Sequence, residues 1–280
     1  MKLPMHLRSI IIPCIMALLF SCESGGPGNE PETSENLIRS FYLDAFPNQG
    51  VINYGRNSIM VFGPCAPGTD YVAHFIISNG ATSTPESGST FTVGHNSVQV
   101  IAENGDERTY DVILEHRNRT ALLIIDLQNA NFPVFRQEML LATINSLHEQ
   151  AHRCDAVTIF IQHTHLGLWE EGSYSWQIHS GVKPGEKDIM LKKETISAMN
   201  HELQDTLNAM GIHRIVLTGT LTELCISETI IPSWESGFHI VVPETGHSTN
   251  DDHPEKVISQ FYNTYNKYIE VLETEEISLQ

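Results

Sequence analysis

The run Ala121-Leu122-Leu123-Ile124-Ile125-Asp126 decides the fold of the C-terminal half of this chain. Five apolar residues stand in a row before a carboxylate, which is typical of a strand buried on both faces of a parallel sheet. Residues 138–153 follow with apolar side chains at helical spacing, and 156–162 has the pattern of a second buried strand. This order of strand, helix and strand predicts an α/β domain with a mostly parallel sheet flanked by helices.

The alternation of strands and helices continues toward the end of the chain. After a long loop, the expected elements are a helix near 200–210, a strand at 214–218, a helix at 223–235, a strand at 238–242, a helix from about His253 and a short strand near 268–272. We therefore predict an α/β domain over 120–280. In such sheets the active site lies at the C-terminal ends of the strands.

Residues 37–116 have the pattern of an all-β module. Short runs rich in β-branched and aromatic residues predict strands at 37–43, 59–62, 72–77, 97–102 and 109–114. Asn104-Gly105 stands between the last two runs, and this pair is the preferred two-residue turn of a hairpin. Strands of this length and spacing predict a small β-sandwich, and the module carries no constellation of catalytic side chains.

The N-terminus has the pattern of a targeting segment. Lys2 and Arg8 precede an apolar run at 10–20, which is too short for a comfortable transmembrane helix. The run ends in Leu19-Phe20-Ser21-Cys22, which resembles a bacterial lipobox and implies cleavage before Cys22 and lipidation of its sulfur. A plain secretory signal with an incidental cysteine is the alternative. Residues 23–36 lack apolar side chains and predict a flexible linker.

Composition narrows the function classes. Hydrophobic residues make up 41% of the 280, which favours a packed core over general disorder. The formal net charge of −18 disfavours nucleic acid and anionic membrane surfaces as partners. If Cys14 leaves with the signal and Cys22 is lipidated, Cys65, Cys154 and Cys225 remain, and this odd number predicts at least one free thiol. A Cys65–Cys154 disulfide is the alternative in oxidising surroundings.

Three segments at predicted strand ends each supply one reactive group. Asp126 ends the first strand, Lys193 precedes the expected helix start at Ser197-Ala198-Met199, and Cys225 follows a buried strand at the opening of a helix. Each residue alone has an ordinary structural explanation. Together, a helix N-terminus and an ammonium are expected to lower the pKa of the thiol. A carboxylate within reach can take its proton and return it to a leaving group.

The same segments resemble a known family. The sequences LLIIDLQNANF (122–132), LKKETISAM (191–199) and GTLTELC (219–225) resemble, in this order, the motifs of isochorismatase-like cysteine hydrolases, and ESGFHIVV (235–242) resembles the following strand of that family. The resemblance covers 120–272 and implies the isochorismatase-like fold. Met199, Glu223 and Glu244-Thr245 depart from the family pattern, which leaves the substrate open.

The resemblance implies a catalytic triad without a cofactor. Cys225 would attack a carbonyl and form a thioester, Asp126 would act as general base and then acid, and Lys193 would stabilise the charged groups. Backbone N–H groups of Leu221 and Cys225 would form the oxyanion hole, and the Thr220–Leu221 peptide would be cis. A nucleophilic cysteine favours hydrolysis of the C–N bond of a small amide or carbamoyl compound.

A substrate pocket is expected beside this triad. Gln162 and His163 follow the second strand, and Trp176 and His179 lie in a loop, 166–186, that resembles the variable lid of the family. We expect these four side chains to line the pocket; for Trp176 and His179 the alternative is packing of the loop onto the sheet.

No metal is expected at this site. The alternative is a nicotinamidase-like metal site at His163 and His165, because His-x-His can bind a transition metal. We expect His247 and His253 to be ordinary surface or capping residues.

Two functions follow from these expectations. The first is an exported, lipid-anchored cysteine hydrolase of the bacterial cell envelope, periplasmic or at the outer-membrane surface. Residues 37–116 resemble immunoglobulin-like modules of Bacteroides-type lipoproteins, which implies a spacer or a module that binds glycan or protein. The resemblance also implies homo-oligomers formed through the hydrolase domain. The second function is a catalytically idle domain that acts as a binding module in a cell-surface assembly.

Overall fold

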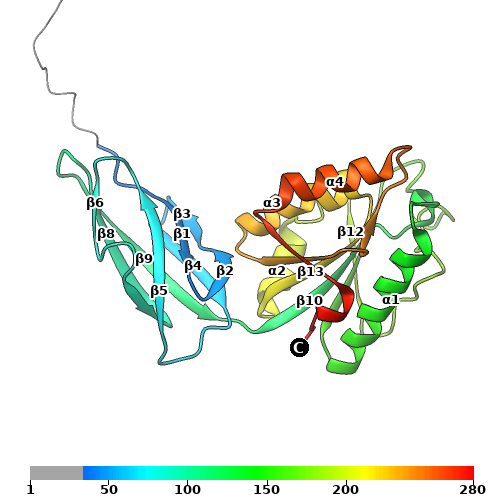
Figure 1. Ribbon diagram of the computed structural model, residues 1–280, viewed down its shortest axis with the longest axis horizontal. Helices are drawn as coiled ribbons and strands as arrows, with labels where there is room; N and C mark the ends of the chain where they lie inside the picture. Colours follow the sequence, from blue (N-terminus) through cyan, green and yellow to red (C-terminus); the bar gives the residue numbers. More distant parts are fainter. Residues whose placement is uncertain (1–33) are drawn as a thin grey trace, which may run out of the picture. The chain divides into compact units, whose positions relative to one another are not determined.

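The computed structural model describes residues 34–280. The predicted signal, Cys22 and most of the predicted linker lie outside the described residues. Figure 1 shows strands alone in the N-terminal part and strands combined with helices in the C-terminal part. Within 34–280, no helix has both the length and the apolar character needed to cross a membrane.

Residues 38–116 form two sheets packed around one apolar core. The strands are β1 (Ile38–Leu43), β2 (Phe46–Gln49), β3 (Val51–Asn53), β4 (Ser58–Gly63), β5 (Asp70–Ile77), β6 (Thr82–Thr84), β7 (Thr90–Thr92), β8 (Gly94–Ile101) and β9 (Glu107–His116). One sheet has the order β2-β1-β5-β7 and the other β3-β4-β9-β8-β6. Phe41, Phe91 and Tyr110 are fully buried between them. The five strands expected from the sequence are present, and four shorter strands complete the sheets.

The turn between β8 and β9 differs from the expected two-residue form. The N–H of Ala102 donates to the carbonyl of Asp106 at 2.9 Å, so three residues, 103–105, form the loop. Gly105 has a φ of +87°, whereas Asn104 does not have a positive φ. A glycine in the left-handed region at the end of a three-residue hairpin loop is the next most common solution. The hairpin is therefore confirmed, and its turn type is corrected.

The C-terminal part is an α/β domain. Its elements are β10 (Arg119–Ile125), α1 (Gln137–Cys154), β11 (Val157–His163), β12 (Ile189–Lys193), α2 (His201–Ala209), β13 (Ile212–Thr220), α3 (Ser227–Glu235), β14 (His239–Pro243), β15 (His247–Ser248), α4 (Pro254–Tyr265) and β16 (Ile269–Leu272), with a π-helical turn at Thr222–Ile226. The sheet order is β12-β11-β10-β13-β14-β16, β15 pairs with β13, and all these pairs are parallel. The predicted parallel α/β domain is confirmed.

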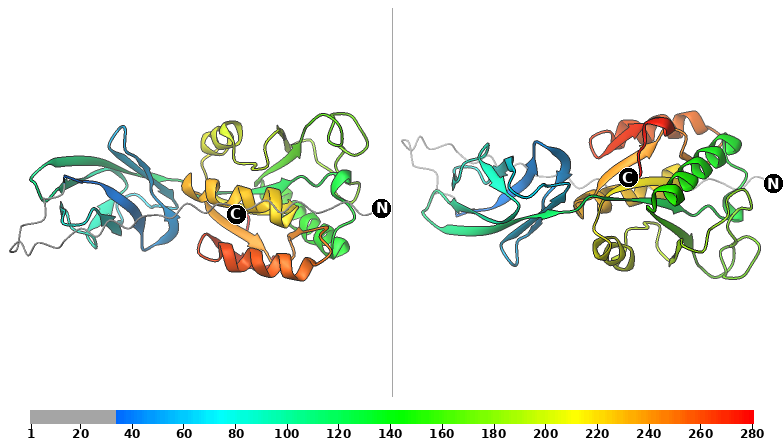
Figure 2. Two further views of the ribbon diagram at one scale, coloured as in Figure 1. Left: turned by 90° about the horizontal axis from the view of Figure 1, so that it is seen from above. Right: turned by 90° about the horizontal axis from the view of Figure 1, so that it is seen from below.

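Helices cover both faces of this sheet, as Figures 1 and 2 show. Along β10, Ala121, Leu123 and Ile125 face a core shared with α2, α3 and α4. Leu122 and Ile124 face a second core, to which α1 and the C-terminal segment contribute. Alternating side chains of one strand therefore enter two separate cores, which explains why the run has no polar residue.

Strand β12 was not predicted from the sequence. Its residues, Ile-Met-Leu-Lys-Lys, alternate between half-buried and exposed side chains because β12 lies at the edge of the sheet. The helix expected near 200–210 is confirmed: α2 begins at His201, where the side chain of Asn200 caps it by accepting from the N–H of Leu203 at 2.9 Å, so Ser197-Ala198-Met199 precedes the helix. Lys193 is the last residue of β12, in agreement with its expected place at a strand end.

The cysteines of the described residues are free thiols. Cys65 is buried in the core of the two β-sheets, Cys154 ends α1, and Cys225 lies in the π-helical turn. A Cys65–Cys154 disulfide is absent from this part of the chain, in agreement with the expectation of at least one free thiol.

Candidate active site

Asp126 follows the last residue of β10 in an unusual backbone conformation. Its φ is +48°, which is uncommon outside glycine. Its N–H donates to the carbonyl of Ile161 at 2.8 Å. Its carbonyl accepts from the hydroxyl of Thr220 at 2.6 Å and from the side-chain amide of Asn131 at 2.8 Å. Both neighbouring strands and the following loop therefore fix the direction in which this carboxylate points.

Gly219 allows β13 to approach β10 closely at this point. A Cβ on Gly219 would lie 2.0 Å from the carbonyl oxygen of Ile125, and the φ of Gly219 is +124°. Any other residue would push the two strands apart or strain the backbone. Two residues later the chain turns through the cis Thr220–Leu221 peptide, which was expected from the sequence, into the π-helical turn that carries Cys225.

Lys193 connects the carboxylate to the thiol. Its ammonium Nζ lies 2.8 Å from Asp126 Oδ2 and 3.3 Å from Cys225 Sγ. It also donates to the carbonyls of Thr195 and Ile196, each at 3.0 Å. The side chain of Lys193 is 0% exposed and that of Asp126 is 1% exposed. The structure thus brings the three predicted catalytic residues together from the ends of β10, β12 and β13.

The buried carboxylate of Asp126 lies beside an ammonium and a thiol. Oδ2 forms an ion pair with Lys193, and the thiol of Cys225 is close enough to act on the carboxylate as a hydrogen-bond donor. Burial raises the pKa of Asp126, and the positive charge of Lys193 only partly offsets this effect. A carboxylate with a raised pKa beside a thiol is suited to accept a proton from it and hold it.

The pKa of the Cys225 thiol is raised, whereas a lowered pKa was expected from the sequence. Burial and the negative charge of Asp126 raise the pKa of Cys225 to about 12, and the ammonium of Lys193 acts in the opposite direction without prevailing. An ammonium lowers the pKa of a thiol, but the burial of this site raises it by more. In the free site the sulfur is therefore a thiol at neutral pH.

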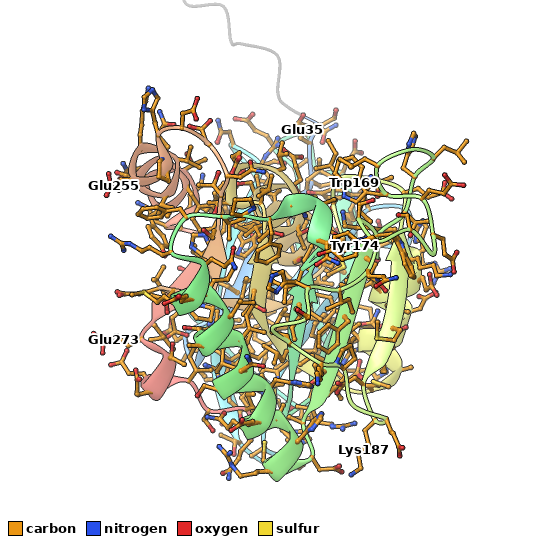
Figure 3. The ribbon with its side chains drawn as sticks, turned by 90° about the vertical axis from the view of Figure 1, so that its right-hand side faces the viewer. Glu35, Trp169, Tyr174, Lys187, Glu255 and Glu273 are labelled. Carbon is orange, nitrogen blue, oxygen red and sulfur yellow. The ribbon has the colours of Figure 1, made fainter. Side chains whose placement is uncertain are left out.

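A pocket of about 380 Å³ opens onto these groups. Asp126, His163 and Cys225 line it, together with Leu221 and Asn131. The rest of its wall is mainly apolar and comprises Ala130, Leu168, Trp169, Ile196, Leu224 and Asn250. Of the described residues that line this pocket, none is Lys or Arg. Figure 3 shows Trp169 at the end of the domain where the lid segment lies.

Three of the four residues expected in the pocket lie elsewhere. His163 lines it, but Gln162 is buried and donates to the carbonyl of Trp176 at 3.0 Å. The indole N–H of Trp176 donates to Thr164 at 3.0 Å, and the ring of His179 stacks on Phe132. Trp176 and His179 therefore pack the loop onto the domain, which was the alternative expected for these two residues.

Gln128 holds the lid in place, a role that the sequence analysis did not assign. Its side chain is fully buried, and its amide nitrogen donates to the carbonyls of His163 and Trp176 at 3.0 and 2.8 Å. Its amide oxygen accepts from the N–H of His163 at 2.8 Å. Gln128 stands within the quoted motif LLIIDLQNANF, so its position in the motif was the available signal.

His247 is buried rather than at the surface, which corrects the expectation for this residue. Its Nδ1 lies 2.9 Å from the hydroxyl of Thr222 and its Nε2 lies 2.9 Å from the hydroxyl of Tyr262. Burial lowers the pKa of His247 to about 4, so the ring is neutral at neutral pH. Thr222 begins the turn that carries Cys225, and this polar chain therefore supports the turn from behind.

The alternative metal site at His163 and His165 does not fit the structure. Nδ1 of His163 lies 3.4 Å from the ammonium of Lys193, which disfavours a cation at this nitrogen. Nδ1 of His165 lies 3.0 Å from the carbonyl oxygen of Leu166, and the ring is exposed. The Nδ1 atoms of the two imidazoles therefore have partners that do not favour a shared metal ion.

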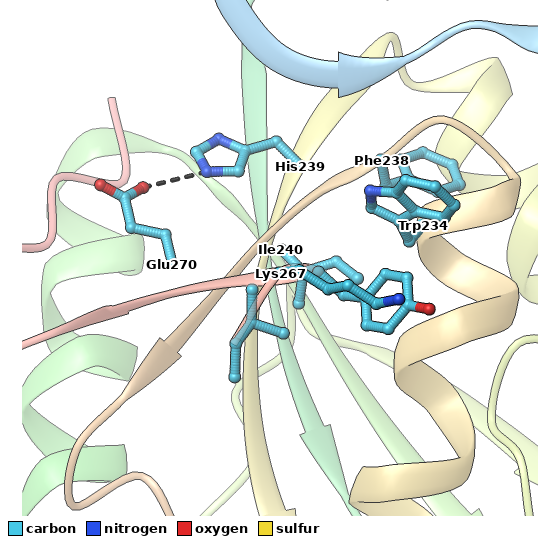
Figure 4. Close-up of a pocket in the computed structure, with 8 residues that line it drawn as sticks. Trp234, Phe238, His239, Ile240, Lys267 and Glu270 are labelled. Atoms are coloured by element: carbon cyan, nitrogen blue, oxygen red, sulfur yellow. Dashed lines mark ion pairs between the residues drawn. The ribbon is translucent and has the colours of Figure 1, made fainter. Parts of the chain in front are cut away.

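A second hollow, of about 420 Å³, lies beside β14 and β16 and is drawn in Figure 4. Trp234, Tyr268 and Lys267 line it, and an ion pair of His239 and Glu270 spans 3.0 Å. Its described lining contains no cysteine, serine or threonine that could act as a nucleophile. The smaller pocket at Cys225 is therefore the candidate active site.

These features define an α/β protein with a cysteine, a carboxylate and an ammonium at the C-terminal edge of a parallel sheet. A family model described as the isochorismatase domain matches residues 120–276, and the chain belongs to the isochorismatase family. A solved structure described as an isochorismatase family protein is 24% identical with a TM-score of 0.52, and the match covers 55% of this chain and 98% of that one. A cysteine hydrolase from Pseudomonas syringae pv. phaseolicola is 17% identical with a TM-score of 0.52, over 56% of this chain and 90% of that one.

Curated relatives match the same half of the chain. Streptothricin hydrolase of Streptomyces noursei is 25% identical over 138 residues, which are 47% of this chain and 50% of that protein. Nicotinamidase 3 of Arabidopsis thaliana is 27% identical over 140 residues, which are 43% of this chain and 68% of that protein. The chain thus spans about half the length of the streptothricin hydrolase that it matches.

Proposed function

We propose that this chain is a cysteine hydrolase that cleaves the C–N bond of a small amide or carbamoyl compound. The observation that carries this proposal is the convergence of Asp126, Lys193 and Cys225 from the ends of three separate strands, with Asp126 and Cys225 lining one pocket. The names of two relatives, a streptothricin hydrolase and a nicotinamidase, support hydrolysis as the reaction class.

The reaction begins with a proton transfer. The sulfur of Cys225 attacks the carbonyl carbon while its proton passes to Asp126, whose raised pKa suits it to hold that proton. The negative charge that develops on the substrate oxygen is stabilised by the backbone N–H groups of Leu221 and Cys225. Lys193 contacts both groups and stabilises the thiolate and the carboxylate in turn.

The leaving group and water complete the cycle. Asp126 gives its proton to the nitrogen, the C–N bond breaks and ammonia or an amine departs from a Cys225 thioester. Asp126 then takes a proton from water, which attacks the thioester carbon. The C–S bond breaks, the thiol regains its proton and a carboxylic acid is released, so one water is consumed for each amide.

The pocket wall favours an uncharged, partly apolar substrate. Leu168, Trp169 and Leu224 form an apolar wall, and the described lining has no Lys or Arg to pair with a substrate carboxylate. An anionic amide would lose its hydration there without gaining a partner. We therefore expect neutral amides to be better substrates than acidic ones.

The decisive experiment is release of ammonia or amine from a panel of neutral and acidic amides and carbamoyl compounds. Release by the parent chain and none by Cys225→Ala supports the proposal. If no compound of the panel reacts and Cys225 is also not acylated by activated esters, the idle binding module is the better account. A Cys154→Ala variant serves as the matched control, because it removes a thiol outside the pocket.

We further propose that the chain is exported and held at the bacterial cell envelope by a lipid on Cys22, with the immunoglobulin-like module at 37–116 as a spacer. The apolar run at 10–20 and the Leu19–Cys22 pattern support this. Incorporation of labelled palmitate by the parent and its loss in Cys22→Ala is the expected result. Incorporation that persists in the variant would contradict the proposal.

A further inference from the structure

A second group of titratable side chains lies at the N-terminal ends of the strands, whereas Cys225 lies at their C-terminal ends. His148 and His152 lie in the C-terminal half of α1, and Asp188 directly precedes β12. Nε2 of His148 lies 2.7 Å from Asp188 Oδ2, and Nε2 of His152 lies 2.8 Å from Asp188 Oδ1. These ligand-type atoms all lie within 4.8 Å of one another.

The group is held in place by its surroundings. The spacing of four residues puts both imidazoles on one face of α1. The ring of His148 packs edge-on against Phe160, with centroids 5.4 Å apart. The carboxylate of Asp188 also accepts from the N–H of Gly185 at 2.6 Å. The two nitrogens and the carboxylate oxygens therefore have fixed directions before any ligand arrives.

The carboxylate of Asp188 is buried, with 2% of its side chain exposed. Each of its two oxygens lies within hydrogen-bond distance of one imidazole nitrogen. The neighbouring ammonium of Lys187 is directed instead to Asp155, 3.0 Å away. The negative end of the α1 dipole adds to the attraction for a cation at this point.

An unpartnered hydroxyl lines the hollow beside the group. This hollow has a volume of about 230 Å³, and His152, Asp188 and Thr158 contribute to its wall. Thr158 is 3% exposed, and its hydroxyl has no hydrogen-bond partner among the described residues. A buried hydroxyl without a partner is costly unless a water or ligand satisfies it. A water bound to a metal ion in this hollow would be such a partner.

We propose that His148, His152 and Asp188 bind a divalent transition-metal ion of the zinc class. The ligands would be the two imidazole Nε2 atoms and one carboxylate oxygen, with water from the hollow in the remaining position. Two imidazoles favour zinc, nickel, cobalt or copper over magnesium or calcium, which prefer oxygen ligands. The proposal departs from the sequence expectation of no metal and does not depend on the proposed hydrolase activity.

The ion would link α1 to the start of β12. Residues 164–188 connect β11 to β12, and Figure 3 shows Trp169 and Tyr174 toward one end of the domain and Lys187 toward the other. The lid residues and Asp188 therefore belong to the same connection. A metal ion at Asp188 would anchor the last residues of this connection to α1 and would therefore have a structural role.

The test is calorimetric titration of zinc chloride into the full chain carrying Cys225→Ala, which removes the thiol that could bind zinc in the other pocket. We expect one equivalent to bind, and binding to weaken at least about tenfold when His152→Asn or Asp188→Asn is added. His95→Asn is the matched control, because His95 also pairs with a carboxylate, that of Asp111, at 3.1 Å on the surface of the β module. Cobalt in place of zinc should give ligand-field absorption without a thiolate charge-transfer band.

Two results would overturn the proposal. One is the absence of saturable zinc binding, which would leave a hydrogen-bonded His–Asp–His clamp and nothing more. The other is binding that His152→Asn leaves unchanged. His152 is 41% exposed, so this variant should fold even if Asp188→Asn does not. A circular dichroism spectrum and thermal melt of each variant without metal separate a folding defect from a binding defect.

Discussion

The ammonium of Lys193 lies 2.8 Å from a carboxylate oxygen of Asp126, with both side chains shielded from water. A charge of either sign alone at this depth would be strongly destabilising, whereas the pair is tolerated. The thiol of Cys225, 3.3 Å from the same ammonium, feels both charges. The protonation state of the sulfur therefore depends on the balance between Asp126 and Lys193.

The first prediction concerns Asp126→Asn. The negative charge of Asp126 helps to raise the pKa of Cys225 to about 12, so its removal should lower that pKa. The pH at which the rate of labelling by iodoacetamide reaches half its maximum should shift downward in the variant. Amide hydrolysis should fall by about two to four orders of magnitude, because the proton acceptor is lost.

Lys193→Met provides the opposite control. Loss of the ammonium should move the midpoint of the labelling profile upward, because the group that lowers the pKa of Cys225 is removed. Identical profiles in the parent and both variants would show that these charges do not act on the sulfur. Cys65 and Cys154 should be replaced by Ala in all three proteins, so that labelling reports on Cys225 alone.

The second prediction concerns stability in acid. Burial lowers the pKa of His247 to about 4 from an ordinary value of 6.5. Between these values the unfolded chain binds a proton that the folded chain does not, so the free energy of unfolding should fall as the pH decreases. The full contribution is about 3 kcal/mol, and it is lost between about pH 7 and pH 4.

His247→Gln tests this assignment by urea unfolding at several pH values. The variant should be less stable than the parent at pH 7, because Thr222 and Tyr262 cannot both keep their partner. Its stability should also depend less steeply on pH between 7 and 4. His253→Gln, at an exposed position, is the control and should leave the slope unchanged. An unchanged slope in His247→Gln would assign the acid sensitivity to other groups.

The third prediction concerns the approach of β13 to β10. Gly219→Ala would place a Cβ 2.0 Å from the carbonyl oxygen of Ile125, which neither strand can accommodate without moving. We expect a loss of several kcal/mol in the free energy of unfolding or failure to fold. Gly68→Ala also has a positive φ, +77°, but its Cβ would meet nothing within 4 Å. This control should cost only about 1 kcal/mol, as thermal unfolding would measure.

The fourth prediction concerns the lid. Gln128→Leu removes the side-chain partner of the carbonyl and the N–H of His163, and it removes one of the two side-chain donors to the carbonyl of Trp176. The expected cost is about 3 kcal/mol of stability, together with faster hydrogen–deuterium exchange across the lid segment. Gln177→Leu changes an exposed residue of the same segment and should leave exchange unaltered. Equal exchange in the two variants would show that Gln128 does not hold the lid.

Buried apolar runs allowed most of the fold to be predicted from the sequence. The run 121–125 has no polar side chain because its residues enter two cores. Such a run predicts a buried strand whatever residues flank it in the sequence. Strand β12 was not predicted because it lies at the edge of the sheet and is only half covered. Its sequence, Ile-Met-Leu-Lys-Lys, does not alternate between polar and apolar residues. The hairpin at Gly105 was found, but its loop length depends on strand twist, which local sequence does not report.

The sequence by itself determined the α/β class of residues 120–280 and the residue types of the candidate triad, because strand ends and motif order are local properties. Only the tertiary structure decided that Lys193 contacts both Asp126 and Cys225, that the thiol has a raised pKa, and that Gln162, Trp176 and His179 lie outside the pocket. Burial and the distances between charges arise when separate strands pack side by side. The convergence of His148, His152 and Asp188 has the same origin, since α1 and the start of β12 meet only in the folded chain.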